Sequence, residues 1–120
     1  MQHTLNINLP EVFHSTYNAN PKTAVLEVLN SHLEPLELLL QGYHSREKVR
    51  QVNLEADSLE LDGTGKGTIT VSYQIEEFNV CAAIDRTDME RMKLTFSISE
   101  ATGMMKVAGI ALPEREPDTF

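Results

Sequence analysis

The sequence has a single cysteine, Cys81, among its 120 residues and therefore cannot form an intramolecular disulfide. It has no apolar run that approaches the length of a membrane span. Its first ten residues lack a basic region followed by an apolar one, and so we expect no secretory signal and no membrane partner. These absences are typical of a reducing compartment, and we expect cytoplasmic localisation.

Basic residues are scarce: ten stand against 18 acidic ones, and the formal net charge is -8. Proteins that contact phosphate backbones usually carry a basic footprint, so the charge argues against direct nucleic-acid binding. The acidic excess is compatible with a basic protein partner. It is also typical of proteins whose charge simply keeps them soluble and apart.

Sites for metals, nucleophiles and phosphates are also missing. The four histidines lie on separate segments, with no two at the helical spacing of a metal site and no paired cysteines. Cys81 lies in an apolar segment without a neighbouring basic residue, and we expect it to be buried and structural. The glycine-rich residues 62–67 predict a hairpin turn, because a strand pattern rather than a helix follows them. We therefore expect no cofactor and no metal.

What the sequence does contain predicts one ordinary domain. At 41% hydrophobic and 23% charged residues, the composition is typical of a globular protein. We expect a single α+β domain over residues 1–112. Residues 113–120 are charged and interrupted by proline, and they predict a flexible acidic tail.

Residues 21–42 predict one long helix around which the domain is built. Asn20 is a good N-cap, and Pro21 suits a first helical turn. Apolar residues recur at steps of three and four and draw a wide stripe, at Val25, Leu29, Leu33, Leu36 and Leu40. Pro35 removes a backbone donor, and we expect it to kink or split the helix between residues 31 and 34.

The remaining segments alternate with a period of two, which predicts strands. After a first strand at residues 4–9, the alternation begins at Val49, and a change of phase near Asp57 and Ser58 indicates a β-bulge. A second change of phase at Glu76 and Glu77 leaves two possibilities, one long bent strand or two strands. Residues 85–91 predict a polar hairpin connection, and residues 92–99 and 104–112 predict the last two strands.

These elements predict an α+β fold in which one long, Pro-kinked helix packs on a curved antiparallel sheet, in the order β-α-β-β-β-β. This element order resembles that of cystatin-like and hot-dog folds. The resemblance concerns the order of elements only and implies no function. The turn at residues 62–67 lacks a Gln-x-Val-x-Gly loop, and so protease inhibition of the cystatin kind is not supported.

A row of carboxylates is the strongest candidate for a binding surface: Glu55, Asp57, Glu60 and Asp62 on one predicted strand, with Glu76 and Glu77 on its neighbour. Acid–base catalysis would need such groups in a cleft, which a solvated strand face does not provide. We therefore favour a non-enzymatic protein-interaction domain, which binds a basic partner or associates with itself. Self-association would form a homodimer through an edge strand, for which residues 104–112 are the candidate.

The alternative is a small-molecule-binding protein or hot-dog-like enzyme with a pocket between helix and sheet near Pro35. His32, Tyr73 and Glu77 are its candidate polar groups. Such a pocket requires polar groups that converge in a concavity. A closed, dry interface between helix and sheet would favour the interaction domain.

Overall fold

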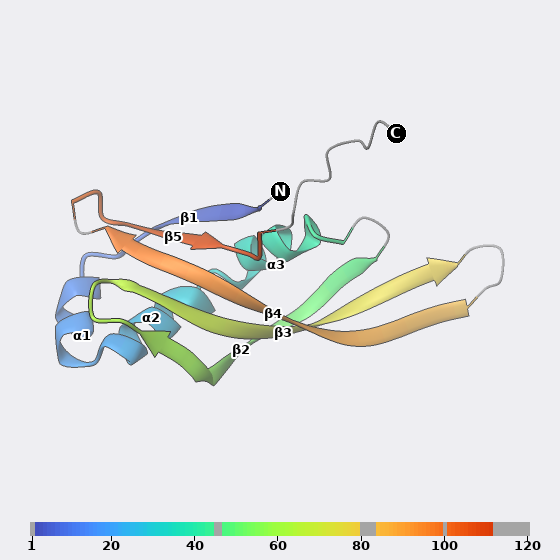
Figure 1. Cartoon of the computed structure of the whole chain (residues 1–120), viewed down its shortest axis with the longest axis horizontal. Coiled ribbons are helices and arrows are strands. Elements are labelled where there is room, and N and C mark those ends of the chain that lie inside the picture. The colour runs from blue at the N-terminus through green and yellow to red at the C-terminus, as the bar shows by residue number, and fades with distance from the viewer. Residues whose placement is uncertain (1, 45–46, 80–83, 100, 112–120) are drawn as a thin grey trace, which may run out of the picture.

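The structure is a computed structural model that describes residues 2–44, 47–79, 84–99 and 101–111. Its elements follow the chain as β1 (Thr4–Asn8), α1 (Phe13–Ala19), α2 (Pro21–Asn30), α3 (Leu33–Gln41), β2 (Lys48–Leu61), β3 (Lys66–Asn79), β4 (Ile84–Ser99) and β5 (Met104–Ala108). The strands form one antiparallel sheet in the order β1-β5-β4-β3-β2. Helices α2 and α3 both contact β2, and α3 also contacts β1, so the helices form a layer on one face of the sheet (Figure 1).

The prediction of an α+β fold with an antiparallel sheet is confirmed, but the prediction of one long helix is wrong. Two short helices, α2 and α3, take its place, and a third short helix, α1, precedes them. The N-terminus of α2 forms as expected, because the backbone N–H of Thr23 donates to the side chain of Asn20 over 3.3 Å. In α1, which precedes it, the buried ring of Phe13 stacks on Tyr17 and attaches the helix to the core.

The chain breaks between α2 and α3 at the place where Pro35 was expected to disrupt it. The hydroxyl of Ser31 and Nδ1 of His32 both lie 2.8 Å from the carbonyl oxygen of Val28, near the C-terminal end of α2. Pro35 then falls in the first turn of α3, where no backbone donor is required. The proline therefore begins a second helix instead of bending a single one.

The strand order also differs from the expected one. β5 lies between β1 and β4, so residues 104–112 do not form an edge strand, and β5 itself ends at Ala108. The edges belong to β1 and β2. The physical reason is that the chain returns to its first strand: β1 pairs along its whole length with β5 and covers the edge that was predicted to be open.

Strand β2 contains the predicted bulge and one more. Its register with β3 shifts between Glu55 and Glu60, which confirms the irregularity predicted near Asp57 and Ser58. A second shift lies between Arg50 and Asn53 and was not predicted. It contains Gln51 at a φ of 51°, a left-handed conformation that costs energy for a residue other than glycine.

Of the two possibilities left open at Glu76 and Glu77, the structure has one continuous strand, since β3 runs through both residues without a register shift. The prediction of a polar connection at residues 85–91 is wrong, because β4 begins at Ile84 and includes these residues. One cause accounts for the change of phase and for the missed strand. This end of the β3–β4 hairpin extends beyond the helices (Figure 1), both of its faces meet solvent, and alternation between apolar and polar residues is lost.

The core lies between the helices and the inner face of the sheet. Leu36 and Leu40 of α3 are fully buried, as are Val49 of β2 and Val71 of β3. No polar or charged residue of the described segments is classed as buried. Apolar side chains therefore fill the interface between α3 and the sheet.

Candidate binding surface on the open face of the sheet

The sheet has a second face, opposite the helices, that no described element covers. In an antiparallel pair, directly opposed residues share a face. Ile69 and Leu94 are opposed and fully buried, so the next opposed pair, Thr68 and Thr95, points the other way. We call this second surface the open face. Among the residues whose side chains the structure describes, it consists of Thr4, Asn6, Asn8, Lys48, Arg50, Asn53, Glu55, Glu60, Lys66, Thr68, Thr70, Ser72, Gln74, Glu76, Thr87, Met89, Arg91, Lys93, Thr95, Ser97, Ser99, Met104, Lys106 and Ala108.

The open face is positively charged although the protein is acidic. Six of the ten basic residues of the chain belong to it, namely Lys48, Arg50, Lys66, Arg91, Lys93 and Lys106. Among the residues whose side chains are described, three carboxylates occupy paired positions on it, those of Glu55, Glu60 and Glu76. The face therefore carries a net positive charge on a chain whose formal charge is -8.

Two carboxylates of the predicted acidic row are paired with arginines. Both oxygens of Glu55 accept from Arg91, from Nε and Nη2 at 2.7 Å each. This hydrogen-bonded carboxylate raises the pKa of the Arg91 guanidinium. Glu76 similarly lies 2.7 Å from Nε of Arg50. These two acids are neutralised within the sheet and are not free to meet a basic partner.

The other four carboxylates of the row are dispersed. Asp62 shapes the β2–β3 turn, where its Oδ1 accepts from the hydroxyl of Thr64 over 2.7 Å and from the backbone N–H of Thr64 over 2.8 Å. These hydrogen bonds lower its pKa. Asp57 is exposed at the bulge, and Glu60 lies on the open face. Glu77 is exposed, and alternation places it on the helix side of the sheet.

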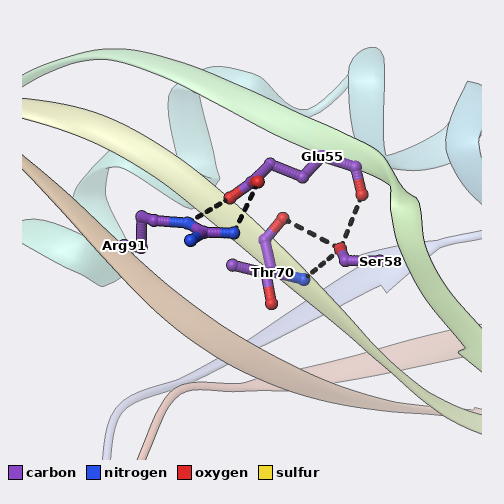
Figure 2. A network of polar contacts seen from close by, with 4 residues as sticks. All are labelled: Glu55, Ser58, Thr70 and Arg91. Atoms are coloured by element: carbon purple, nitrogen blue, oxygen red, sulfur yellow. Dashed lines mark hydrogen bonds and ion pairs between the residues drawn. The ribbon is translucent and has the colours of Figure 1, made fainter.

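A hydrogen-bond network holds the bulge of β2 beside the open face (Figure 2). The hydroxyl of Ser58 donates to the carbonyl oxygen of Glu55 over 2.6 Å and accepts from the backbone N–H of Thr70 over 2.8 Å. It replaces the ladder bond that the bulge removes from β3. The ion pair of Arg91 and Glu55 links β4 to β2 across β3 at the same level.

Lysines with free ammonium groups remain on the same face. In the described part of the chain, no carboxylate lies within ion-pair distance of Lys93 or Lys106. Lys66 interacts electrostatically with Asp62, whose carboxylate is already engaged in the turn. Ser97 is opposed to Lys66 of β3 on one side and to Lys106 of β5 on the other. This places Lys66, Ser97 and Lys106 in one row across three strands.

This row borders a groove of about 590 Å³, a volume within the range of small-ligand sites. Its lining comes from β2, β3, β4, β5 and the N-terminal residues: Gln2, Glu60, Leu61, Asp62, Lys66, Gly67, Thr68, Thr95, Phe96, Ser97, Lys106 and Ala108. Hydroxyl and ammonium groups thus converge on a concave surface that includes the apolar Leu61 and Ala108. Gly67 leaves no room for a side chain, because a Cβ there would clash with the backbone of Glu60.

The three residues proposed for a pocket between helix and sheet make separate contacts. His32 bonds to Val28 within the helical layer. The hydroxyl of Tyr73 lies 2.8 Å from Nε2 of His44, and burial, with Glu90 and Glu47 adding to it, raises the Tyr73 pKa to about 12. None of His32, Tyr73 and Glu77 lines the groove of the open face.

Two further predictions fall on residues outside the described segments, namely the burial of Cys81 and the flexible tail at residues 113–120. Among the residues that are described, no three histidine, cysteine or acidic side chains are arranged to hold a metal ion. No helix of this part is long and apolar enough to cross a membrane.

The basic residues of the open face were not predicted from the sequence. A signal was present, since Lys93 and Lys106 lie in predicted strands and Lys66 lies in the predicted turn just before one. Only the register of β3, β4 and β5 brings them onto one surface. The chain matches no family model, and no curated protein or solved structure is significantly similar to it.

Proposed function

We propose that this protein is a non-enzymatic protein-interaction domain that binds a macromolecular partner on the open face of its sheet. One observation carries the proposal: most basic residues of this acidic chain are concentrated on the open face of the sheet. A wet face of an antiparallel sheet needs polar residues, but it does not need one sign of charge. Charge sorting of this kind supports oriented docking, because complementary potentials steer a partner and fix its orientation.

The dimensions of the molecule support an interface of ordinary size. The protein measures 54 × 37 × 22 Å, and the sheet extends along its two longer dimensions (Figure 1). A standard interface buries about 800 Å² on each partner, which is less than this broad surface offers. The open face can therefore hold a partner without rearrangement of the helices.

The alternatives receive less support from the same contacts. Leu36, Leu40 and Val49 are fully buried between helix and sheet, which leaves no ligand pocket at that place. Half of the predicted acidic row is either paired with arginine or engaged in the turn, which weakens the case for a basic partner. Self-association through an edge is disfavoured at β2, because bulges protect sheet edges from pairing, and β1 is short.

A matched pair of charge reversals tests the proposal. Lys93→Glu reverses an exposed charge on the open face, and Lys22→Glu makes the same change of net charge at the N-terminus of α2. Tagged parent and variant proteins would capture the partner from a lysate of the source cells, with elution by increasing salt. We expect Lys93→Glu to lose the partner that the parent and Lys22→Glu retain. Equal retention by both variants would show that the open face is not the interface.

A further inference from the structure

We propose that the partner presents an extended acidic segment, and that one carboxylate of this segment binds between the ammonium groups of Lys66 and Lys106, over the hydroxyl of Ser97. This inference rests on the proposed function and names the chemistry of the partner. It follows from the register of the sheet, the ion pairs already formed and the composition of the groove.

The register places the three groups together. Ser97 is directly opposed to Lys66 on one neighbouring strand and to Lys106 on the other. Because neighbouring strands lie about 4.8 Å apart, the two lysine Cα atoms flank Ser97 at a separation of about 10 Å. All three side chains point to the open face, and lysine side chains are long and flexible enough to meet above the serine.

The positive charges of this row are only partly compensated within the described part of the chain. Lys106 has no ion pair, and the carboxylate near Lys66 already accepts several hydrogen bonds at the turn. Two ammonium groups side by side repel each other, and an anion placed between them relieves that repulsion. The hydroxyl of Ser97 adds a donor for the same anion.

The carboxylates that line the same groove discriminate between kinds of anionic partner. They belong to Glu60, near the end of β2, and to Asp62, in the turn beside Lys66. A nucleic-acid strand, with a charge on every phosphate, would meet these carboxylates unfavourably. A peptide with spaced acidic residues avoids them, and its polar groups can bond to the hydroxyls of Thr68 and Thr95.

A second lysine without an ion pair in the described segments, Lys93 on β4, determines the spacing that we expect between acidic residues of the partner segment. Lys93 precedes Ser97 by four residues on the same strand and on the same face, about 13 Å away along an extended strand. An extended peptide that runs along β4 would meet both positions with acidic residues four positions apart. The structure therefore favours a segment with this spacing over one with adjacent acids.

The probe is a fluorescent peptide of serine and threonine that carries two glutamates four positions apart, measured by fluorescence anisotropy. The test variant is Lys66→Gln with Lys106→Gln, and Lys22→Glu is the control with the same change in net charge. Each of these lysines is exposed, and thermal melting verifies that each variant is folded. We expect the double variant to bind on the order of tenfold more weakly than the parent, a loss equivalent to about 1.4 kcal/mol. We expect the control to bind within about twofold of the parent, and added salt to weaken parental binding.

Several results would overturn the inference. They are an unchanged affinity in the double variant, inorganic phosphate that competes as well as the peptide itself, and tighter binding of a single-stranded oligonucleotide. A peptide with adjacent glutamates that binds as well as the spaced one would overturn the predicted spacing. The two proposals can fail separately. Capture that is lost with Lys93→Glu but kept by the double variant would leave the open face as the interface and remove the acidic segment from this row.

Discussion

Replacement of Ser58 by alanine probes the bulge that shapes the open face. The Ser58 hydroxyl accepts from the backbone N–H of Thr70 over 2.8 Å and donates to the carbonyl oxygen of Glu55 over 2.6 Å. Alanine removes both bonds and leaves a partly buried N–H donor in the middle of β3 without its partner. A buried donor left unsatisfied costs about 1–3 kcal/mol.

We therefore expect Ser58→Ala to lower the free energy of unfolding by about 2 kcal/mol, which lowers the melting temperature of a chain of this size by roughly 8 °C. The ion pair of Arg91 with Glu55, in the same network, should contribute less. Arg91 is 66% exposed in its side chain, and exposed ion pairs are worth at most about 1 kcal/mol. The partly buried hydroxyl of Ser58 should therefore contribute more to stability than the exposed ion pair of Arg91.

Urea unfolding of the parent, Ser58→Ala and Ser72→Ala decides between these expectations. Ser72 lies on the same face of β3, and no hydrogen bond of its hydroxyl stabilises the described structure. We expect this control to remain within about 0.5 kcal/mol of the parent. Faster hydrogen exchange at the amide of Thr70 should accompany the loss in Ser58→Ala. Equal stability of the two variants would refute the role assigned to the hydroxyl.

Four further changes test other parts of the account. Gln51→Gly should stabilise the protein by about 0.5–1 kcal/mol in urea unfolding, because it relieves a positive φ, whereas a loss of stability would mean that the side chain itself is required. Pro35→Ala should change the melting temperature little, since Pro35 lies in the first turn of α3, and a clear rise would contradict the assigned helix boundary. Gly67→Ala should destabilise the fold by more than about 2 kcal/mol, because its Cβ would clash with the backbone of Glu60 and with the ring of Phe96. A variant as stable as the parent would exclude this packing. The pKa of Tyr73 is raised from 10.0 to about 12, so its contribution to stability is complete below pH 10 and is lost as the pH rises to about 12. Tyr73→Phe should therefore flatten this part of the plot of unfolding free energy against pH, and an unchanged plot would argue against the shift.

The sequence predicted local structure where one rule acted alone. Asn20 and Pro21 begin α2, and the change of phase near Asp57 and Ser58 marks a bulge, because capping and alternation are local properties. Alternation failed around Glu76 and Glu77. It reports burial on one face, and this end of the hairpin has no helix to bury against.

The site depends on pairings that sequence alone does not specify. Lys66 and Lys106 are 40 positions apart in the chain. The register of β3 with β4 sets Lys66 opposite Ser97, and the pairing of β5 with β4 sets Lys106 opposite the same residue. The acidic row was visible in the sequence, but its neutralisation was not, since Arg91 reaches Glu55 across an intervening strand. The composition predicts an acidic protein, but it does not predict that one face of the sheet is basic.

The most direct test of the central claim is amide chemical-shift mapping of the isotope-labelled protein with the captured partner. The account predicts shifts at open-face residues of β3, β4 and β5, such as Thr68, Lys93, Thr95 and Ser97, with the amides of α2 and α3 unchanged. Shifts confined to the helices, with an unperturbed open face, would contradict it.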